Sequence, residues 1–169
     1  MNCKIRKWSL SDAHELAQIL GNTNVQNNLR DGFPLPYTDN DAAEYIRSVL
    51  NDKERSVFAF AVTLDDKVVG SIGIFRKDNI HFRTAEMGYC LSEPYWGRGI
   101  ASAAVKLACS LVFENSDIIR IFAEPFADNA ASCRVLEKCG FEYEGTMKSN
   151  AVKNSQIIDM KLYALIKSN

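Results

Sequence analysis

The 169-residue sequence lacks a long apolar run, an apolar leader and an excess of charge of either sign. No stretch approaches the roughly 18 apolar residues that span a bilayer, and the N-terminus has no apolar segment of signal-peptide length. Its 20 basic and 21 acidic side chains give a net charge of -1, so no global field would attract nucleic acid or an anionic membrane. We therefore expect a soluble, cytoplasmic protein with no nucleic-acid or membrane partner.

Residues that bind metals are also scarce. The only two histidines, His14 and His81, belong to no H-E-x-x-H motif, and no two cysteines form a Cys-x-x-Cys pair. The five cysteines are odd in number and lie mostly among apolar neighbours, as expected of reduced thiols that fill a core. The sequence therefore predicts no metal site.

The composition, 47% hydrophobic and 24% charged, is that of a globular protein, and the sequence contains no repeat, low-complexity tract or linker. We expect residues 1–169 to form one domain. Ser9 with Asp12, and Thr38 with Asp41, have the spacing of capping boxes that begin helices. The predicted order is a strand at 3–8, a helix at 9–20, a helical turn within 22–30, a proline-containing loop at 31–37, a helix at 38–52, strands at 56–64, 67–75 and 84–91, a helix at 99–114, a strand at 118–124, a helix at 129–139, and strands at 141–148 and 157–166.

This order indicates an α+β protein. The strand at 84–91, the helix at 99–114 and the strand at 118–124 form a βαβ crossover, which requires one parallel pair. The other strands follow one another in a meander. The expected fold is a mixed, mostly antiparallel twisted sheet of about seven strands, with helices on both faces.

A glycine-flanked turn at 92–102 joins a strand to a mostly apolar helix. Gly97 and Gly99 bracket Arg98, so the backbone can approach a ligand where the first N–H groups of the helix are free to bind phosphate. A Walker loop is excluded because G-x-x-x-x-G-K-[ST] is absent; Ser102 and Glu124 imitate a dinucleotide fingerprint only loosely. From this turn alone, an anion site and a purely structural turn are both open.

Residues 96–101 resemble the [RQ]-x-x-G-x-[GA] motif of Gcn5-related (GNAT) N-acetyltransferases, and within them the chain is similar to the RimJ/RimL-type branch. Trp96 replaces the Arg or Gln of the general motif, and Ala103 stands where this branch often has Glu. The resemblance extends over nearly the whole chain. Further segments that carry it are 85–89, 129–132, 140–145 and 159–163.

The resemblance implies acetyl-CoA as the acetyl donor, direct attack by an amine and no metal. It makes Glu86 the candidate base, directly or through water, and Ser132 the donor of a proton to the leaving thiolate. A backbone N–H at Cys90 or Leu91 would stabilise the oxyanion, next to a bulge that the sequence cannot confirm; the Cys90 thiol itself is expected to be a filler. The residues expected to bind the cofactor are Leu91, Ser92, Trp96, Gly97, Arg98, Gly99, Ile100, Ala101, Ser102 and Asn129.

Three of these assignments have a structural alternative. Glu86 could be a solvated glutamate on the face of a strand, Asn129 a simple N-cap, and Arg98 an exposed residue of the first helical turn. The resemblance implies a primary amine flanked by small or polar groups as acceptor, with protein or peptide N-termini first and small amines second; a homodimer is compatible with it. The alternative functions are a non-catalytic acyl-CoA-binding module and a dinucleotide-binding protein.

Overall fold

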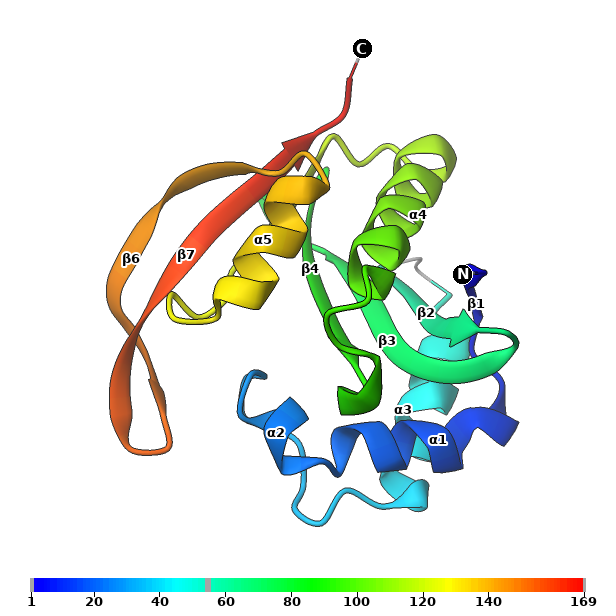
Figure 1. Ribbon diagram of the computed structural model, residues 1–169. Helices are drawn as coiled ribbons and strands as arrows, with labels where there is room; N and C mark the ends of the chain where they lie inside the picture. Colours follow the sequence, from blue (N-terminus) through cyan, green and yellow to red (C-terminus); the bar gives the residue numbers. More distant parts are fainter. Residues whose placement is uncertain (1, 54–55, 169) are drawn as a thin grey trace.

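The computed structural model describes residues 2–53 and 56–168, which form a seven-stranded sheet with helices on both faces (Figure 1). The strand order is β1-β2-β3-β4-β5-β7-β6, and β4 with β5 is the parallel pair that the crossover predicts. The mixed, mostly antiparallel fold expected from the sequence is therefore confirmed. The elements are β1 (Cys3–Lys7), η1 (Leu10–Asp12), α1 (Ala13–Leu20), α2 (Thr23–Gln26), α3 (Asp39–Leu50), β2 (Val57–Leu64), β3 (Lys67–Arg76), η2 (Asn79–His81), β4 (Thr84–Leu91), η3 (Glu93–Tyr95), α4 (Ile100–Asn115), β5 (Arg120–Ala123), α5 (Ala130–Lys138), β6 (Glu142–Lys153) and β7 (Gln156–Ile166).

Both predicted capping boxes are present. Thr38 and Asp41 begin α3, whereas Ser9 and Asp12 begin the short 3-10 turn η1, which then continues into α1. Asp12 is also buried and receives two hydrogen bonds from the Arg6 guanidinium, at 2.7 and 2.8 Å. Its carboxylate thus joins β1 to the start of the helical layer.

Two strands differ from their predicted lengths. Residues 118–124 were expected to be extended, but β5 covers only Arg120–Ala123. Ile118 is fully buried before β5 begins, so its apolar character reflects the core and not the strand ladder. The strand expected at 141–148 continues to Lys153, because pairing with β7 resumes after a register shift between Met147 and Ala151.

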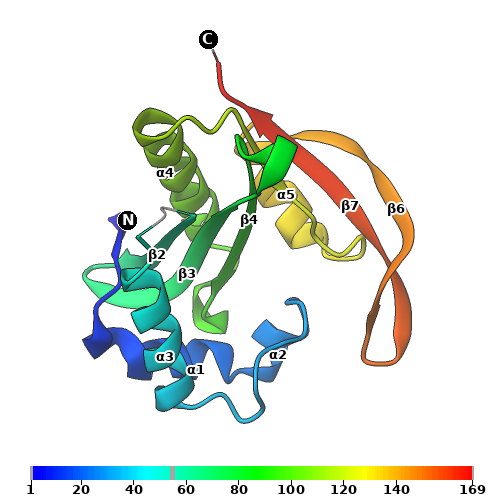
Figure 2. The same cartoon turned by 180° about the vertical axis from the view of Figure 1, so that it is seen from behind.

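The sheet separates two apolar cores. Helices α4 and α5 cover one face, and α1 and α3 cover the other, as the reverse view shows (Figure 2). Along β4, Ala85, Met87 and Leu91 are buried with the α4 core, whereas Cys90 packs against the α1/α3 core. The period of two in a strand therefore gives β4 two different faces. In the described part of the chain, no helix is long and apolar enough to cross a bilayer.

The strands β4 and β5 diverge after a short contact. Their pairing covers only Thr84 to Glu86 on β4 and Arg120 to Phe122 on β5. Beyond Glu86, the edge of β4 that faces β5 no longer pairs with it, and the sheet opens at the place where α4 and α5 begin.

Candidate active site

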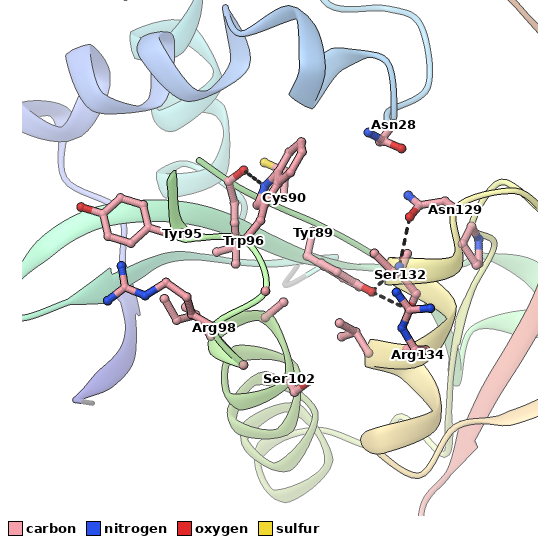
Figure 3. A pocket seen from close by; sticks show the side chains of 18 of the residues that line it. Asn28, Tyr89, Cys90, Tyr95, Trp96, Arg98, Ser102, Asn129, Ser132 and Arg134 are labelled. Carbon is pink, nitrogen blue, oxygen red and sulfur yellow. Dashed lines mark hydrogen bonds between the residues drawn. The ribbon is translucent and has the colours of Figure 1, made fainter. Parts of the chain in front are cut away.

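A cavity of about 460 Å³ lies at this opening, between the end of β4, the start of α4 and the first turns of α5 (Figure 3). Ser132 and Cys90 line it, as do nine of the residues that the sequence assigns to the cofactor. Those nine are Leu91, Trp96, Gly97, Arg98, Gly99, Ile100, Ala101, Ser102 and Asn129. Ser92 is not among the lining residues, because its N–H donates to the Val69 carbonyl at 2.8 Å and continues the β3–β4 ladder.

The glycines fix the backbone of the turn before α4. Gly97 and Gly99 have φ values of 70° and 76°, in the left-handed region where other residues are strained. Gly99 is the N-cap of α4 and supplies no side-chain acceptor. The first N–H bonded within the helix is that of Ala103, which donates to the Gly99 carbonyl at 3.1 Å. The N–H groups of residues 100–102 therefore stay available to an anion beside the cavity.

Aromatic side chains hold this turn in place. The Trp96 indole donates to the Leu91 carbonyl at 2.8 Å and so closes the loop that starts at the end of β4. The Arg98 guanidinium lies 5.4 Å from the centre of the Tyr95 ring. Trp96, which replaces Arg or Gln of the general motif, thus stabilises the turn through its hydrogen bond to Leu91. Arg98 lies over the Tyr95 ring beside the cavity.

The first turn of α5 contributes the Ser132 hydroxyl to the site, next to the Tyr89 hydroxyl of β4. The Asn129 side chain accepts a hydrogen bond from the Ser132 N–H at 3.0 Å and so caps this helix, as expected if Asn129 is an N-cap residue. Its amide nitrogen has no partner among the described residues and can still donate to a ligand. The Ser132 hydroxyl lies 2.8 Å from the Tyr89 hydroxyl, and burial raises the pKa of Tyr89 to about 12. Tyr89 is therefore a neutral phenol that shares a hydrogen bond with the Ser132 hydroxyl.

Among the lining residues that the sequence analysis did not assign to the site are Tyr89, Arg134 and Lys138. Arg134 and Lys138 are four residues apart, so they lie on one face of α5, and that spacing was a usable signal. Tyr89 gave none, because an aromatic residue in a strand most often fills a core. The two cations place positive charge at the cavity, although the net charge of the whole protein is -1.

The expected bulge in the strand at 84–91 is not seen against β3. The register runs without a shift from the Arg76–Ala85 pair to the Gly70–Leu91 pair; the nearest shift lies between β2 and β3, at Val62. Because the Ser92 N–H donates to β3, the alternation of an antiparallel ladder directs the Cys90 N–H toward β3 as well. The Leu91 N–H faces the opening toward β5. Of the two expected oxyanion donors, Leu91 has the suitable orientation and Cys90 does not.

The Cys90 thiol is not a nucleophile in this environment. Part of its surface lines the cavity, yet burial raises its pKa to about 12. The thiol is therefore protonated at neutral pH, and no histidine hydrogen-bonds to it.

Glu86 lies on the other face of β4 and does not line the cavity. One of its carboxylate oxygens is 2.5 Å from the Arg30 guanidinium, and the other is 3.1 Å from the Lys77 ammonium. Arg30 also binds the Glu124 carboxylate at 2.9 Å. Glu86 is thus not a freely solvated glutamate, and an incoming ammonium group would have to compete with Arg30. In the described residues, no group of three or more His, Cys, Asp or Glu side chains is placed to hold a metal ion.

Known proteins share this fold. The model of the acetyltransferase (GNAT) domain matches residues 3–142. An uncharacterised N-acetyltransferase, p20 of Bacillus licheniformis, is 29% identical over 167 residues, covering 96% of this chain and 92% of its own. Two solved structures share the fold at lower identity. The ribosomal-protein-S5-alanine acetyltransferase of Vibrio fischeri aligns with a TM-score of 0.88 and 23% identity, over 98% of this chain and 93% of its own. RimJ of Mycobacterium smegmatis, in complex with a CoA disulfide, aligns with a TM-score of 0.85 and 21% identity, over 97% and 81%.

The family match covers most of the chain and includes the turn at 92–102, both glycines and the capped start of α5. The structure brings these segments together around one cavity at the divergence of β4 and β5. The chain therefore belongs to the GNAT family of acetyltransferases and is an N-acetyltransferase.

Proposed function

We propose that this enzyme binds acetyl-CoA in the cavity of about 460 Å³ and transfers its acetyl group directly to a primary amine, without a metal or a covalent enzyme intermediate. The observation that carries this proposal is the turn around Gly97 and Gly99, which presents the unpaired N–H groups of α4 to a cavity that extends to Tyr89 and Ser132. One cavity thus contains both an anion site and a proton donor. Acetyl-CoA needs the first for its pyrophosphate and the second for its leaving thiolate.

At the phosphate end, the N–H groups of residues 100–102 bind the pyrophosphate oxygens, helped by the positive end of the α4 dipole. Arg134 and Lys138 add positive charge from α5. The free amide nitrogen of Asn129 donates to the pantetheine arm, while its oxygen continues to cap α5. When bound, acetyl-CoA supplies an activated acetyl group at the inner end of the cavity.

At the reacting end, three groups act on the transferred acetyl. The Leu91 N–H donates to the carbonyl oxygen as negative charge develops there. The Ser132 hydroxyl gives a proton to the leaving sulfur, and the Tyr89 hydroxyl, 2.8 Å away, restores it. Neither hydroxyl needs to be ionised beforehand, which agrees with the raised pKa of Tyr89.

On the amine side, Glu86 binds the ammonium group of the acceptor in place of Arg30 and receives its proton, directly or through water. An α-amino group has a reference pKa of about 8, against about 10.4 for lysine, so an N-terminal amine loses its proton more readily near neutral pH. We therefore propose an α-amino group, foremost that of a protein or peptide, as the acceptor. We also propose a cytoplasmic location, where cysteines such as the five free thiols here stay reduced.

Ligand-dependent thermal stability, followed by an acetyl-transfer assay, tests this function. Acetyl-CoA and CoA should raise the melting temperature by mass action, and NADH should not. Release of CoA should then depend on an added amine. Stabilisation by acetyl-CoA with no transfer to any amine would indicate a non-catalytic binding module, and stabilisation by NADH alone would indicate a dinucleotide-binding protein.

A further inference from the structure

A second cavity, of about 160 Å³, lies on the α1/α3 face of β4. Its floor is a pair of glycines, Gly73 on β3 and Gly88 on β4, which are direct partners in the β3–β4 register. Directly opposite residues in an antiparallel pair share one face; the Phe75 ring covers Gly73, whereas the space over Gly88 stays open and leaves a hollow beside it. Phe33 and Phe75 are among the residues that line it.

The two cavities meet at a single strand. Tyr89 and Cys90 line both of them, from opposite sides of β4. A group held in the smaller cavity is therefore separated from the inner end of the larger one only by the backbone and side chains of these two residues. This is the side from which an amine would reach an acetyl group held at Leu91.

Glu86 does not line the smaller cavity but lies beside it along β4. Phe75, which lines it, is the direct partner of Glu86 on the same face of the sheet, and Gly88 lies two residues farther along β4. An amine bound to Glu86 would thus place its substituent toward the hollow.

The lining of the smaller cavity has few free groups that could hydrogen-bond to a polar substituent. Two of its hydroxyl groups, those of Tyr45 and Ser71, hydrogen-bond to each other. Burial keeps the Cys90 thiol protonated, and the other side chains of the lining, among them Leu20, are hydrocarbon or aromatic. Polar atoms of a ligand would lose hydrogen bonds to water here, whereas an apolar group would gain from leaving water.

We infer that the acceptor is an α-amino compound with a medium-sized apolar side chain, of leucine or methionine type, which fills the smaller cavity while its ammonium group binds Glu86. This inference rests on the proposed function and names the acceptor class more narrowly. It replaces the small or polar flanking groups expected from the sequence. The space exceeds several-fold the roughly 30 Å³ that one water occupies in the liquid, so an alanine side chain would leave most of it unfilled.

Gly88 offers a way to fill the cavity without disturbing the sheet. A Cβ built on Gly88 meets no atom within 4 Å, whereas one on Gly73 would approach the Phe75 ring to 2.6 Å. Gly88→Val therefore adds a branched side chain that suits a strand and points into the hollow. Phe33→Ala makes the opposite change, since it removes part of the wall. Leu35→Ala is the matched control, because Leu35 lies on the same loop, is 73% exposed and does not line the cavity.

The experiment measures kcat/KM with saturating acetyl-CoA for peptides X-Gly-Ser-Gly that differ only in X. The wild type should prefer X = Leu or Met over X = Ala by about tenfold, equal to about 1.4 kcal/mol of transition-state discrimination. Gly88→Val and Phe33→Ala should reduce this ratio to about one, and Leu35→Ala should retain it. Free L-leucine and L-leucinamide, run in parallel, distinguish a peptide from a free amino acid as the source of the group.

Two results would overturn the inference. Equal kcat/KM for the leucyl and alanyl peptides in the wild type would show that the cavity is not used, and so would a Gly88→Val enzyme that retains the full preference. The proposed function fails differently, because then neither the peptides nor free L-leucine and L-leucinamide are acetylated. Melting temperatures of each variant with and without acetyl-CoA identify any protein that fails to fold.

Discussion

The N-terminus of α4 allows the phosphate site to be tested with a pair of substitutions that differ only in charge. Gly99→Gln and Gly99→Glu introduce the same bulk and the same left-handed strain, about 1–2 kcal/mol, so both should lose similar stability without ligand. Only Glu places a negative charge beside the N–H groups of residues 100–102. At about 4 Å and an effective dielectric constant near 20, two like unit charges repel by about 4 kcal/mol. After partial screening by solvent, we expect about 2–4 kcal/mol.

This energy corresponds to a Kd for acetyl-CoA that is at least about thirtyfold higher for Gly99→Glu than for Gly99→Gln. Calorimetric titration of both variants at low salt measures the ratio directly. Raising the salt from about 0.1 to 1 M shortens the screening length from roughly 10 to 3 Å, so the ratio should shrink toward one. Two folded variants with equal Kd values at low salt would refute the assignment of the phosphate site to this helix N-terminus.

The other predictions concern proton transfer, the amine site and the stability of the fold. Ser132→Ala should lower kcat at least about a hundredfold with little change in acetyl-CoA affinity, and Tyr89→Phe less, because a proton donor to the sulfur matters only as the bond breaks; unchanged kcat in both would assign the proton to water. Glu86→Gln should regain part of its activity at high pH, where more of the free amine is unprotonated, and a wild-type pH profile would exclude Glu86 as the group that receives the proton. Arg30→Gln should lower KM for the amine about threefold, since the competing guanidinium is gone; a raised KM in steady-state assays would show that Arg30 binds the substrate instead. Asp12→Asn should lower the free energy of unfolding at pH 7 by about 1–3 kcal/mol, as expected when a buried charged acceptor is lost. The Arg6 guanidinium holds the pKa of Asp12 below its usual value, so this contribution is present above about pH 4 and disappears as the pH falls through the folded-state pKa; urea unfolding from pH 2 to 7 should show the two proteins converging.

The sequence was sufficient for the order of elements because each signal was local. Capping boxes mark where helices start, and glycines mark where the chain must turn, as at Gly99. The short length of β5 could not be foreseen, since Ile118 is apolar for reasons of burial and not of strand pairing. The extra length of β6 depends on a register shift with β7, which only the partner strand determines.

Within the site, the turn at 92–102 and its place beside a cavity could be predicted, and the contacts between distant segments could not. The pairing of Glu86 with Arg30 joins residues 56 positions apart, and nothing near either residue indicates it. The same holds for Gly73 and Gly88, which are unremarkable separately in the sequence and form a hollow only because β3 and β4 align them. Such pairings follow from register, which a single sequence determines weakly.

The alternation along β4 has a consequence for how this enzyme could be diversified. Leu91 lines only the cavity proposed for the acetyl donor and Gly88 only the cavity proposed for the acceptor, whereas Tyr89 and Cys90 line both. A mutational library restricted to positions 86 and 88, which do not line the donor cavity, would therefore vary the choice of amine against a constant acetyl donor. Variants that use new acceptors could be selected in this way while the residues of the donor cavity stay unchanged.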